Sequence, residues 1–231
     1  MIPTGNNVWL ALIAVIAYIL GSFSTAYFVT RGMTGKDIRF EGSRNVGGMN
    51  AYSIIKGNRS GKLATAGLAI IQATDMGKGI LAIYIARWLG FLGYNPAIAL
   101  ILASAFVILG HNYIFYFRFK QGGRGLATFM GVLLGLNEPS LPIWMGTVIL
   151  SIVIAQCITG GKTNWKSFTS FFSVLGKQVA GRLAGMGIAL VPLYFFDPRL
   201  LFPVLAATIL ILIKHAGSIK ALVRGTENPP K

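Results

Sequence analysis

The sequence predicts an all-α, polytopic membrane protein with about seven transmembrane helices, and its composition is the first evidence. Of the 231 residues, 54% are hydrophobic and only 12% are charged, which is about half the charged share of a soluble domain. So little charge could not cover the surface of a soluble enzyme. The same apolarity excludes a disordered chain and argues against a nucleic-acid-binding protein.

The second observation is the recurrence of apolar stretches, because a helix needs roughly 20 apolar residues to cross a bilayer. Residues 8–29 carry no charge and include Trp9, a residue type common at membrane interfaces. Residues 63–92 are also apolar but too long for one straight crossing, so we expect this crossing to be bent or broken. The other crossings are predicted at residues 97–117, 126–158 (divided by Asn137, Glu138 and Pro139, so that residues 126–136 form a short crossing), 178–196 and 200–213.

The third observation is the placement of the cations, since basic loops face the cytoplasm. There are 21 Lys and Arg against 6 Asp and Glu, a net charge of +15. Most of the Lys and Arg residues fall in four segments, at residues 31–62, 118–125, 159–182 and 214–231. Basic loops and loops without cations alternate consistently along the chain only if it crosses the membrane seven times, with some crossings short or broken. The N-terminus then lies outside and the C-terminus in the cytoplasm.

We expect residues 1–231 to form a single membrane-embedded domain without a separate soluble domain. The longest polar segment, residues 32–62, is too short to bury a core of its own. Any site must therefore lie where the cytoplasmic loops meet the helix ends. Cys157 is the only cysteine, which excludes an internal disulfide, and by default it is a buried apolar thiol.

The first basic loop contains a candidate anion site at residues 42–50, which read Gly-Ser-Arg-Asn-Val-Gly-Gly-Met-Asn. Glycines let backbone N–H groups turn toward one point and bind an anion. Helix propensity recovers after Asn50, and a helix N-terminus there would add its dipole. The alternative is a flexible linker between two crossings.

The second basic loop, residues 120–128, reads Lys-Gln-Gly-Gly-Arg-Gly-Leu-Ala-Thr and runs into an apolar helix. Glycines and a basic residue before a helix form a second phosphate-cradle pattern. The alternative is a tight turn whose charge only orients the protein. His111, nine residues upstream of Lys120, is either a ligand or base, or a structural group.

Two further features lie outside these loops. In the tail, His215 and Ser218 are one helical turn apart; the alternative there is a basic amphipathic segment on anionic lipid. Inside residues 63–92, Asp75 and Lys78 are three apart and can pair. Such an intramembrane ion pair is either functional or a structural staple.

The sequence lacks the residue patterns that several kinds of catalytic site require. With three Asp and three Glu in the chain, no spacing offers a divalent-metal cluster. There is no His-x4-Asp pattern and no Gly-x-Ser-x-Gly elbow. The remaining chemistry is anion binding and positioning, without metal or cofactor.

The motifs together, in this order, resemble the bacterial-type acyl-phosphate:glycerol-3-phosphate acyltransferase family of membrane enzymes. The resemblance rests on residues 37–50, on Asp75-x-x-Lys78-Gly79, on Gly110-His111 with residues 122–128, and on His215 with residues 222–227. It implies the transfer of an acyl group from acyl phosphate to the 1-hydroxyl of glycerol 3-phosphate, the first acylation of phospholipid synthesis. It also implies a plasma-membrane protein, in contact with lipids, whose active site faces the cytoplasm.

The resemblance implies roles for individual residues. The expected catalytic residues are Ser43, Arg124 and His215. The expected substrate-binding residues are Arg44, Asn45, Gly47, Asn50, Gly122, Gly123, Thr128, Lys214, Ser218 and Glu227. Structural or supporting roles are expected for Asp75, Lys78, His111 and Lys120.

The chain departs from the family pattern at several motif positions. Arg44 replaces a glycine, Ser53 stands where an arginine is common, and Arg124 replaces a lysine. Other departures are Met49 for threonine, Ile114 for proline, Gln121 as an insertion, Lys214 for arginine and Ser218 for asparagine. Lys and Arg are not interchangeable at a phosphate site.

These departures leave two alternatives to a glycerol-3-phosphate acyltransferase. One is a related transferase with a different polyol-phosphate acceptor, or a degenerate lipid-phosphate binder. The other is an anion transporter, which the broken crossings and the Asp75–Lys78 pair would suit. Against a transporter, the polar motifs all lie on one predicted side of the membrane, whereas a transport path needs groups at the midplane.

Overall fold

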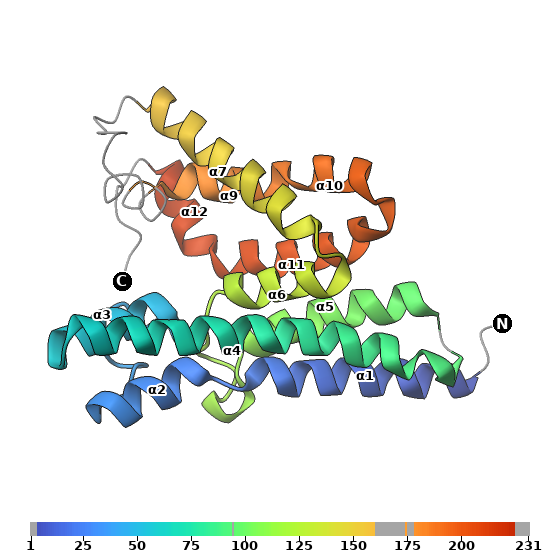
Figure 1. The fold of residues 1–231 in the computed structure, drawn as a ribbon, viewed down its shortest axis with the longest axis horizontal. Coiled ribbons are helices and arrows are strands. Elements are labelled where there is room, and N and C mark those ends of the chain that lie inside the picture. The colour runs from blue at the N-terminus through green and yellow to red at the C-terminus, as the bar shows by residue number, and fades with distance from the viewer. Residues whose placement is uncertain (1–3, 94, 160–173, 175–177, 225–231) are drawn as a thin grey trace.

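A computed structural model describes residues 4–93, 95–159, 174 and 178–224, and these residues form helices and loops without a strand. One group of helices consists of α1 (Thr4–Ser22), α2 (Thr25–Thr34), α3 (Gly48–Asn58), α4 (Gly61–Trp88) and α5 (Pro96–Asn112). The other consists of α7 (Ser140–Ile158), α9 (Val179–Ile188), α10 (Leu190–Phe196), α11 (Leu201–Lys214) and α12 (Ala216–Val223). The short helix α6 (Leu126–Leu136) lies between the two groups (Figure 1).

Within the described part of the chain, five segments are long and apolar enough to cross a membrane by length and composition: Asn7–Thr34, Gly61–Trp88, Pro96–Phe117, Ser140–Ile158 and Val179–Phe196. Helix α6 has the predicted bounds, but its 11 residues span only about 16 Å. Helix α11 has 14 residues. The count of seven crossings depends on these two short helices and stays a prediction.

The first crossing is interrupted, although residues 8–29 predicted one uninterrupted helix. Helix α1 ends at Ser22 and α2 begins at Thr25, with the Ser24 hydroxyl accepting a hydrogen bond from the Tyr27 N–H at 3.3 Å. The Ser24 N–H donates to the Tyr116 hydroxyl at 3.0 Å. A serine that caps the following helix offers the backbone an alternative to a continuous helix.

The second crossing is continuous, contrary to the expected bend or break in residues 63–92. Helix α4 runs through 28 residues, or about 42 Å, which exceeds the roughly 30 Å of the hydrocarbon layer. Gly77 and Gly79 both lie within it. A helix longer than the layer can tilt or project from it, so the length does not require a break.

Glycines let pairs of helices approach backbone to backbone. A Cβ atom on Gly79 of α4 would collide with the Thr128 carbonyl of α6, and one on Gly131 of α6 would collide with the Met76 carbonyl. Gly21 of α1 and Gly110 of α5 form a similar reciprocal contact. These two crossings set how closely α4 meets α6 and α1 meets α5.

Lys78 joins the first group of helices at its centre. Its ammonium group donates to the carbonyls of Gly21 and Phe23, at 3.1 and 3.2 Å, where α1 is interrupted. It also lies 2.8 Å from the carboxylate of Asp75 and 2.8 Å from Nδ1 of His111. The predicted Asp75–Lys78 pair is therefore confirmed as a buried pair, and it ties α4 to α1 and α5.

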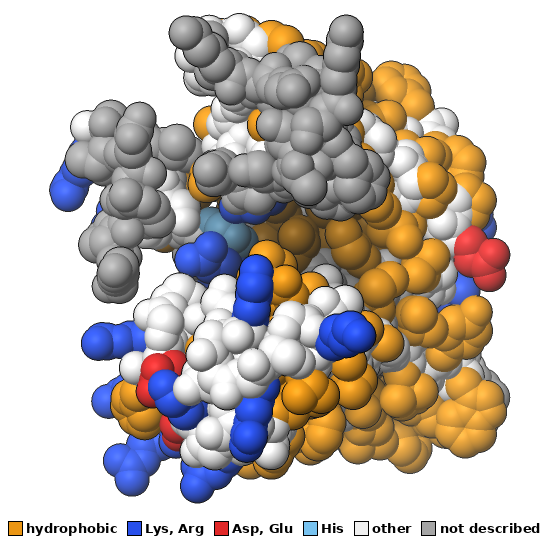
Figure 2. All heavy atoms as spheres, turned by 60° about the vertical axis from the view of Figure 1, so that its left-hand side comes forward, with side chains coloured by type: hydrophobic (Ala, Val, Ile, Leu, Met, Phe, Trp, Pro, Cys, Tyr) orange, Lys and Arg blue, Asp and Glu red, His pale blue; other side chains and the backbone are white. Residues whose placement is uncertain are grey.

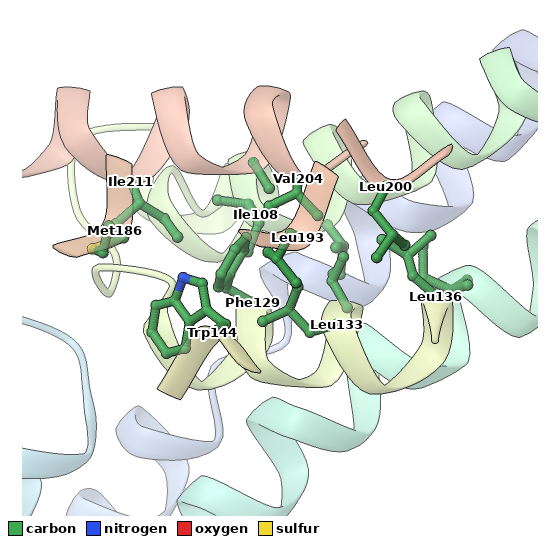
Figure 3. Close-up of a cluster of buried hydrophobic side chains, with 14 of the residues drawn as sticks. Ile108, Phe129, Leu133, Leu136, Trp144, Met186, Leu193, Leu200, Val204 and Ile211 are labelled. Carbon is green, nitrogen blue, oxygen red and sulfur yellow. The ribbon is translucent and has the colours of Figure 1, made fainter. Parts of the chain in front are cut away.

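Helix α6 is the centre of the larger hydrophobic core (Figure 3). Phe129 packs edge-on against Trp144 of α7 with ring centroids 5.3 Å apart. Side chains from α5, α9, α10 and α11 surround them, including Ile108, Met186, Leu193 and Ile211. Cys157 lies outside this core and is exposed near the end of α7, so the expectation of a buried thiol is wrong. Helix α7 buries only Ser140, Trp144, Val148 and Ile152, which share one face.

The cations are concentrated at one end of the molecule. Figure 2 brings the end with α2 and α3 forward and shows Lys and Arg side chains gathered there, beside a hydrophobic flank. Exposed residues at this end include Arg44, Lys56, Arg59 and Lys62. This is the distribution expected of a helical membrane protein with basic loops on one side.

We predict that Gly131→Ala destabilises the protein by about 2 kcal/mol, because the added methyl group must force α6 away from the Met76 backbone. The matched control is Gly77→Ala, since a Cβ atom at Gly77 of α4 meets nothing within 4 Å. Thermal unfolding in detergent measures both variants. Equal losses of stability would contradict the close α4–α6 contact.

We predict that Lys78→Met lowers the free energy of unfolding by about 3–5 kcal/mol, because it leaves the Asp75 carboxylate buried without its partner. Lys62→Met, an exposed position at the start of the same helix, should change it by less than about 0.5 kcal/mol. The double variant Asp75→Asn/Lys78→Met should lose less than the sum of the single changes. Additive losses would show that the two side chains do not interact.

Candidate functional site

A cavity of about 210 Å³ lies where the two groups of helices meet at the cation-rich end. Figure 2 shows a histidine side chain in a hollow there, with Lys and Arg side chains beside it. The cavity is lined by the first loop and the start of α3, by α4 and α5, by the start of α6, and by α9 and His215. Segments from the whole length of the chain therefore contribute to one site.

The start of α3 forms one wall through Asn45, Gly47, Gly48 and Met49. Gly47 precedes the helix, and no side chain caps the first N–H groups of α3. An uncapped helix N-terminus presents unpaired donors and the positive end of the helix dipole. The first loop thus meets a helix N-terminus at the cavity, and Asn45 and Gly47, two of the expected substrate-binding residues, line it.

The buried side chain of Asn50 fixes the conformation of the first loop through hydrogen bonds. Its side-chain amide donates to the carbonyls of Glu41 and Asn45 at 3.1 and 3.0 Å, and its oxygen accepts from the Ser43 N–H at 3.0 Å. Asn50 is buried, whereas Ser43 and Arg44 are exposed, and none of the three lines the cavity. The geometry gives Asn50 a positioning role in place of the expected contact with substrate.

The second loop forms the opposite wall, through Arg124 and the start of α6. Gly125 precedes α6 with φ +81°, a left-handed conformation that favours glycine, and no side chain caps the first turn. Leu126 and Ala127 line the cavity beside it. The N-termini of α3 and α6 therefore open onto the same space.

Gly122 and Gly123 position this loop without lining the cavity. The Gly122 carbonyl accepts a hydrogen bond from the Val46 N–H at 3.1 Å, which joins the two loops. The Gly123 N–H donates to the His111 carbonyl at 3.0 Å, and a Cβ atom on Gly123 would collide with the ring of His111. The glycines at these positions let the loop lie against α5.

Two guanidinium groups line the cavity, and sequence analysis predicted only one of them. Arg124 comes from the second loop, while Arg182 comes from α9, and the sequence pattern attributes the charge of Arg182 to membrane orientation alone. Partial burial lowers the pKa of Arg124, but an arginine keeps its charge at neutral pH. The signal that pointed to Arg182 was its position as the one charge inside the apolar residues 178–196.

The other cations expected at the site lie elsewhere. Lys120 is exposed outside the cavity lining. Lys214 donates to the Asn112 carbonyl at 2.8 Å and lies 4.2 Å from the centre of the Tyr113 ring. Burial and then the charge of Arg124 lower the pKa of Lys214. Lys214 therefore fastens the end of α11 to the end of α5.

His215 lines the cavity with a defined ring orientation. Its Nδ1 lies 2.9 Å from the Ile211 carbonyl, and because a carbonyl only accepts, we assign the proton to Nδ1. Burial lowers the pKa of His215; the bond to Ile211 opposes this shift, and the charges of Arg124 and Arg182 add to it. The ring is therefore neutral at pH 7, with the lone pair on Nε2 able to accept a proton.

Asp75 and His111 line the cavity beside the buried Lys78. The hydroxyl of Thr128 lies 3.3 Å from Nδ1 of His111 and is buried outside the lining. Ser218 is likewise buried outside the lining, and Glu227 lies outside the described residues. Among the described residues no group of three or more His, Cys, Asp or Glu could hold a metal ion.

Comparison with known proteins identifies the family. The family model described as glycerol-3-phosphate acyltransferase matches residues 11–225. The glycerol-3-phosphate acyltransferase of Clostridioides difficile (strain 630) is 30% identical over 94% of this chain and 93% of that protein. The protein of the same name from Coxiella burnetii (strain Dugway 5J108-111) is 32% identical over 94% and 96%.

A solved structure shows the same fold. The crystal structure of PlsY, an integral membrane glycerol 3-phosphate acyltransferase, in its glycerol 3-phosphate form superposes with a TM-score of 0.68 at 20% identity, covering 96% of each chain. The family model and the curated relatives confirm the resemblance inferred from the motifs. The chain belongs to the glycerol-3-phosphate acyltransferase family.

Proposed function

We propose that this acyltransferase uses acyl phosphate as its donor and transfers the acyl group to the 1-hydroxyl of glycerol 3-phosphate in the cavity between α3 and α6. The observation that carries the proposal is the convergence of two uncapped helix N-termini, Arg124 and His215 on one space. Both proposed reactants carry phosphate, and helix N-termini and guanidinium groups bind phosphate.

The donor is already activated, so the reaction needs no nucleophilic side chain. The 1-hydroxyl oxygen attacks the acyl carbon and forms the ester bond, and the bond from that carbon to the phosphate oxygen breaks. The electron pair of the broken bond leaves with inorganic phosphate. We assign the hydroxyl proton to Nε2 of His215, because Nδ1 is held on the Ile211 carbonyl. Arg124 stabilises the charge that develops on the departing phosphate.

This chemistry requires neither metal nor cofactor. The cavity supplies positive charge through Arg124 and the helix N-termini, where a metal ion would otherwise neutralise phosphate. Of the described residues in its lining, the acid is Asp75, which is paired with Lys78 at 2.8 Å. We therefore propose catalysis by binding, positioning and electrostatic stabilisation.

We also propose the membrane arrangement inferred from the sequence: one domain in the plasma membrane, seven crossings, the N-terminus outside, and the C-terminus and cavity on the cytoplasmic side. The concentration of cations at the cavity end supports this orientation. The same lipid bilayer would hold the acyl chain of the donor and receive the lysophosphatidate product.

A different polyol-phosphate acceptor is the second candidate, favoured by Ser53. Its hydroxyl donates to the Met49 carbonyl within α3 at 3.1 Å, so it brings no cation to the position where the family commonly has an arginine. Glycerol 3-phosphate and other polyol phosphates share the same chemistry, and the acceptor is decided by comparing their kcat/KM values.

We predict that purified protein releases inorganic phosphate when acyl phosphate and glycerol 3-phosphate are both present, and not with acyl phosphate alone. Arg124→Gln should lower kcat/KM by about a hundredfold, because a donor to the transition-state charge is lost. Phosphate release and formation of lysophosphatidate are measured together. Folded protein that releases no more phosphate than a boiled control would disprove the proposed reaction.

We predict that His215→Gln lowers kcat by about 10²-fold or more, as expected for loss of a general base. Because burial lowers the pKa of His215, the wild-type rate should decline on acidification at a lower pH than an ordinary histidine would give, as the ring gains a proton. The variant should lack this additional decline beyond that of the substrate phosphates. Lys220→Gln, an exposed change on α12, is the control. Identical pH profiles for the wild type and His215→Gln would refute the base assignment.

A further inference from the structure

Arg182 is a cation of the cavity that the motifs do not account for. It belongs to α9, in the group of helices opposite the two glycine loops, and lines the cavity with Arg124 and His215. Its side chain is partly buried. Arg124, Arg182 and His215 thus share one cavity although they come from three different segments of the chain.

Arg124 from the second loop and Arg182 from α9 line one cavity. Among the described residues of the lining, the acid is Asp75, which is bonded to Lys78 at 2.8 Å. Guanidinium groups form two parallel hydrogen bonds with a phosphate, and a pair of them can hold a doubly charged one. The arrangement therefore suits a phosphate group bound between α6 and α9.

The apolar residues of the cavity lining indicate what kind of phosphate compound would bind there. Met186 follows Arg182 by four residues on α9, so both lie on one face and both line the cavity. On the opposite wall, Arg124 is followed by Leu126 and Met130, which also line it. Each guanidinium is thus accompanied by flexible apolar side chains, which adapt to an alkyl chain. This pattern fits an amphiphile with an anionic head.

We propose that Arg182 binds the phosphate of the acyl donor opposite Arg124, with Met186 and Met130 beside the first carbons of its acyl chain. This inference rests on the proposed function, because it takes the phosphate-headed amphiphile to be acyl phosphate. Glycerol 3-phosphate lacks an acyl chain and would occupy the remaining wall, at the N-terminus of α3. Arg182 then selects the donor rather than the acceptor.

The test compares Arg182→Gln and Arg182→Lys with the control Lys62→Gln, an exposed change at the cation-rich end and outside the cavity. Arg182→Gln should raise KM for acyl phosphate about tenfold or more, the equivalent of one lost charged hydrogen bond. KM for glycerol 3-phosphate should stay within about twofold, and Arg182→Lys should recover part of the loss. An unchanged KM for acyl phosphate, or a rise confined to glycerol 3-phosphate, would overturn the assignment.

A binding measurement separates this inference from the proposed reaction. Decyl phosphonate, a stable phosphate-headed amphiphile, should raise the unfolding temperature of the wild type and of Lys62→Gln, but not that of Arg182→Gln. Decanol, which lacks the anionic head, is the ligand control. Protection by decyl phosphonate without turnover would retain the inference and reject the reaction. Turnover with no protection, or with equal protection of Arg182→Gln, would retain the reaction and reject the inference.

Discussion

The ammonium group of Lys78 is the interaction on which the architecture of the site depends. A buried cation is tolerated only when each of its donors has a partner, and Lys78 finds partners on α1, α4 and α5. It uses the carbonyl groups freed where α1 ends, so the interruption at residues 22–25 and the lysine explain each other. Through His111 the same cluster reaches the second loop, because the His111 carbonyl accepts the Gly123 N–H. The packing of helices and the shape of the anion site are therefore coupled.

The surplus of positive charge serves two separate purposes. In the proposed topology, cations on the exposed loops orient the protein in the membrane, whereas Arg124 and Arg182 line the cavity. Asp37 pairs with Arg39 and Asp197 with Arg199 outside the cavity, whereas Asp75, which lines the cavity, pairs with Lys78. The lining also carries the guanidinium groups of Arg124 and Arg182, and cations in a cleft focus a positive potential on it.

Sequence reasoning located elements that are determined locally and missed features that depend on distant contacts. The bounds of α6 follow from Gly125 and from Asn137 and Pro139, and the structure confirms them. The Asp75–Lys78 pair follows from helical spacing alone. The interruption after Ser22 could not be predicted, because its carbonyl groups are satisfied by a lysine more than 50 residues away. Lys214 ends the apolar helix α11, and Arg182 lies near the start of the apolar helix α9. Only the tertiary structure shows that Lys214 is bonded to the end of α5, whereas Arg182 lines the cavity.

The departures from the family motifs have a common structural consequence. Ser53 brings no charge to α3, and Arg44 lies outside the cavity lining, so neither residue supplies a cation to the cavity. The cation that does line the cavity, Arg182, comes from the opposite group of helices. If that guanidinium holds the donor phosphate, the phosphate fits between Arg182 and Arg124 only when the separation of α9 from α6 is maintained. Phosphate binding is then linked to the packing of Met186 against the core around Phe129 and Trp144. Under this proposal the two groups of helices form the two sides of one anion-binding site.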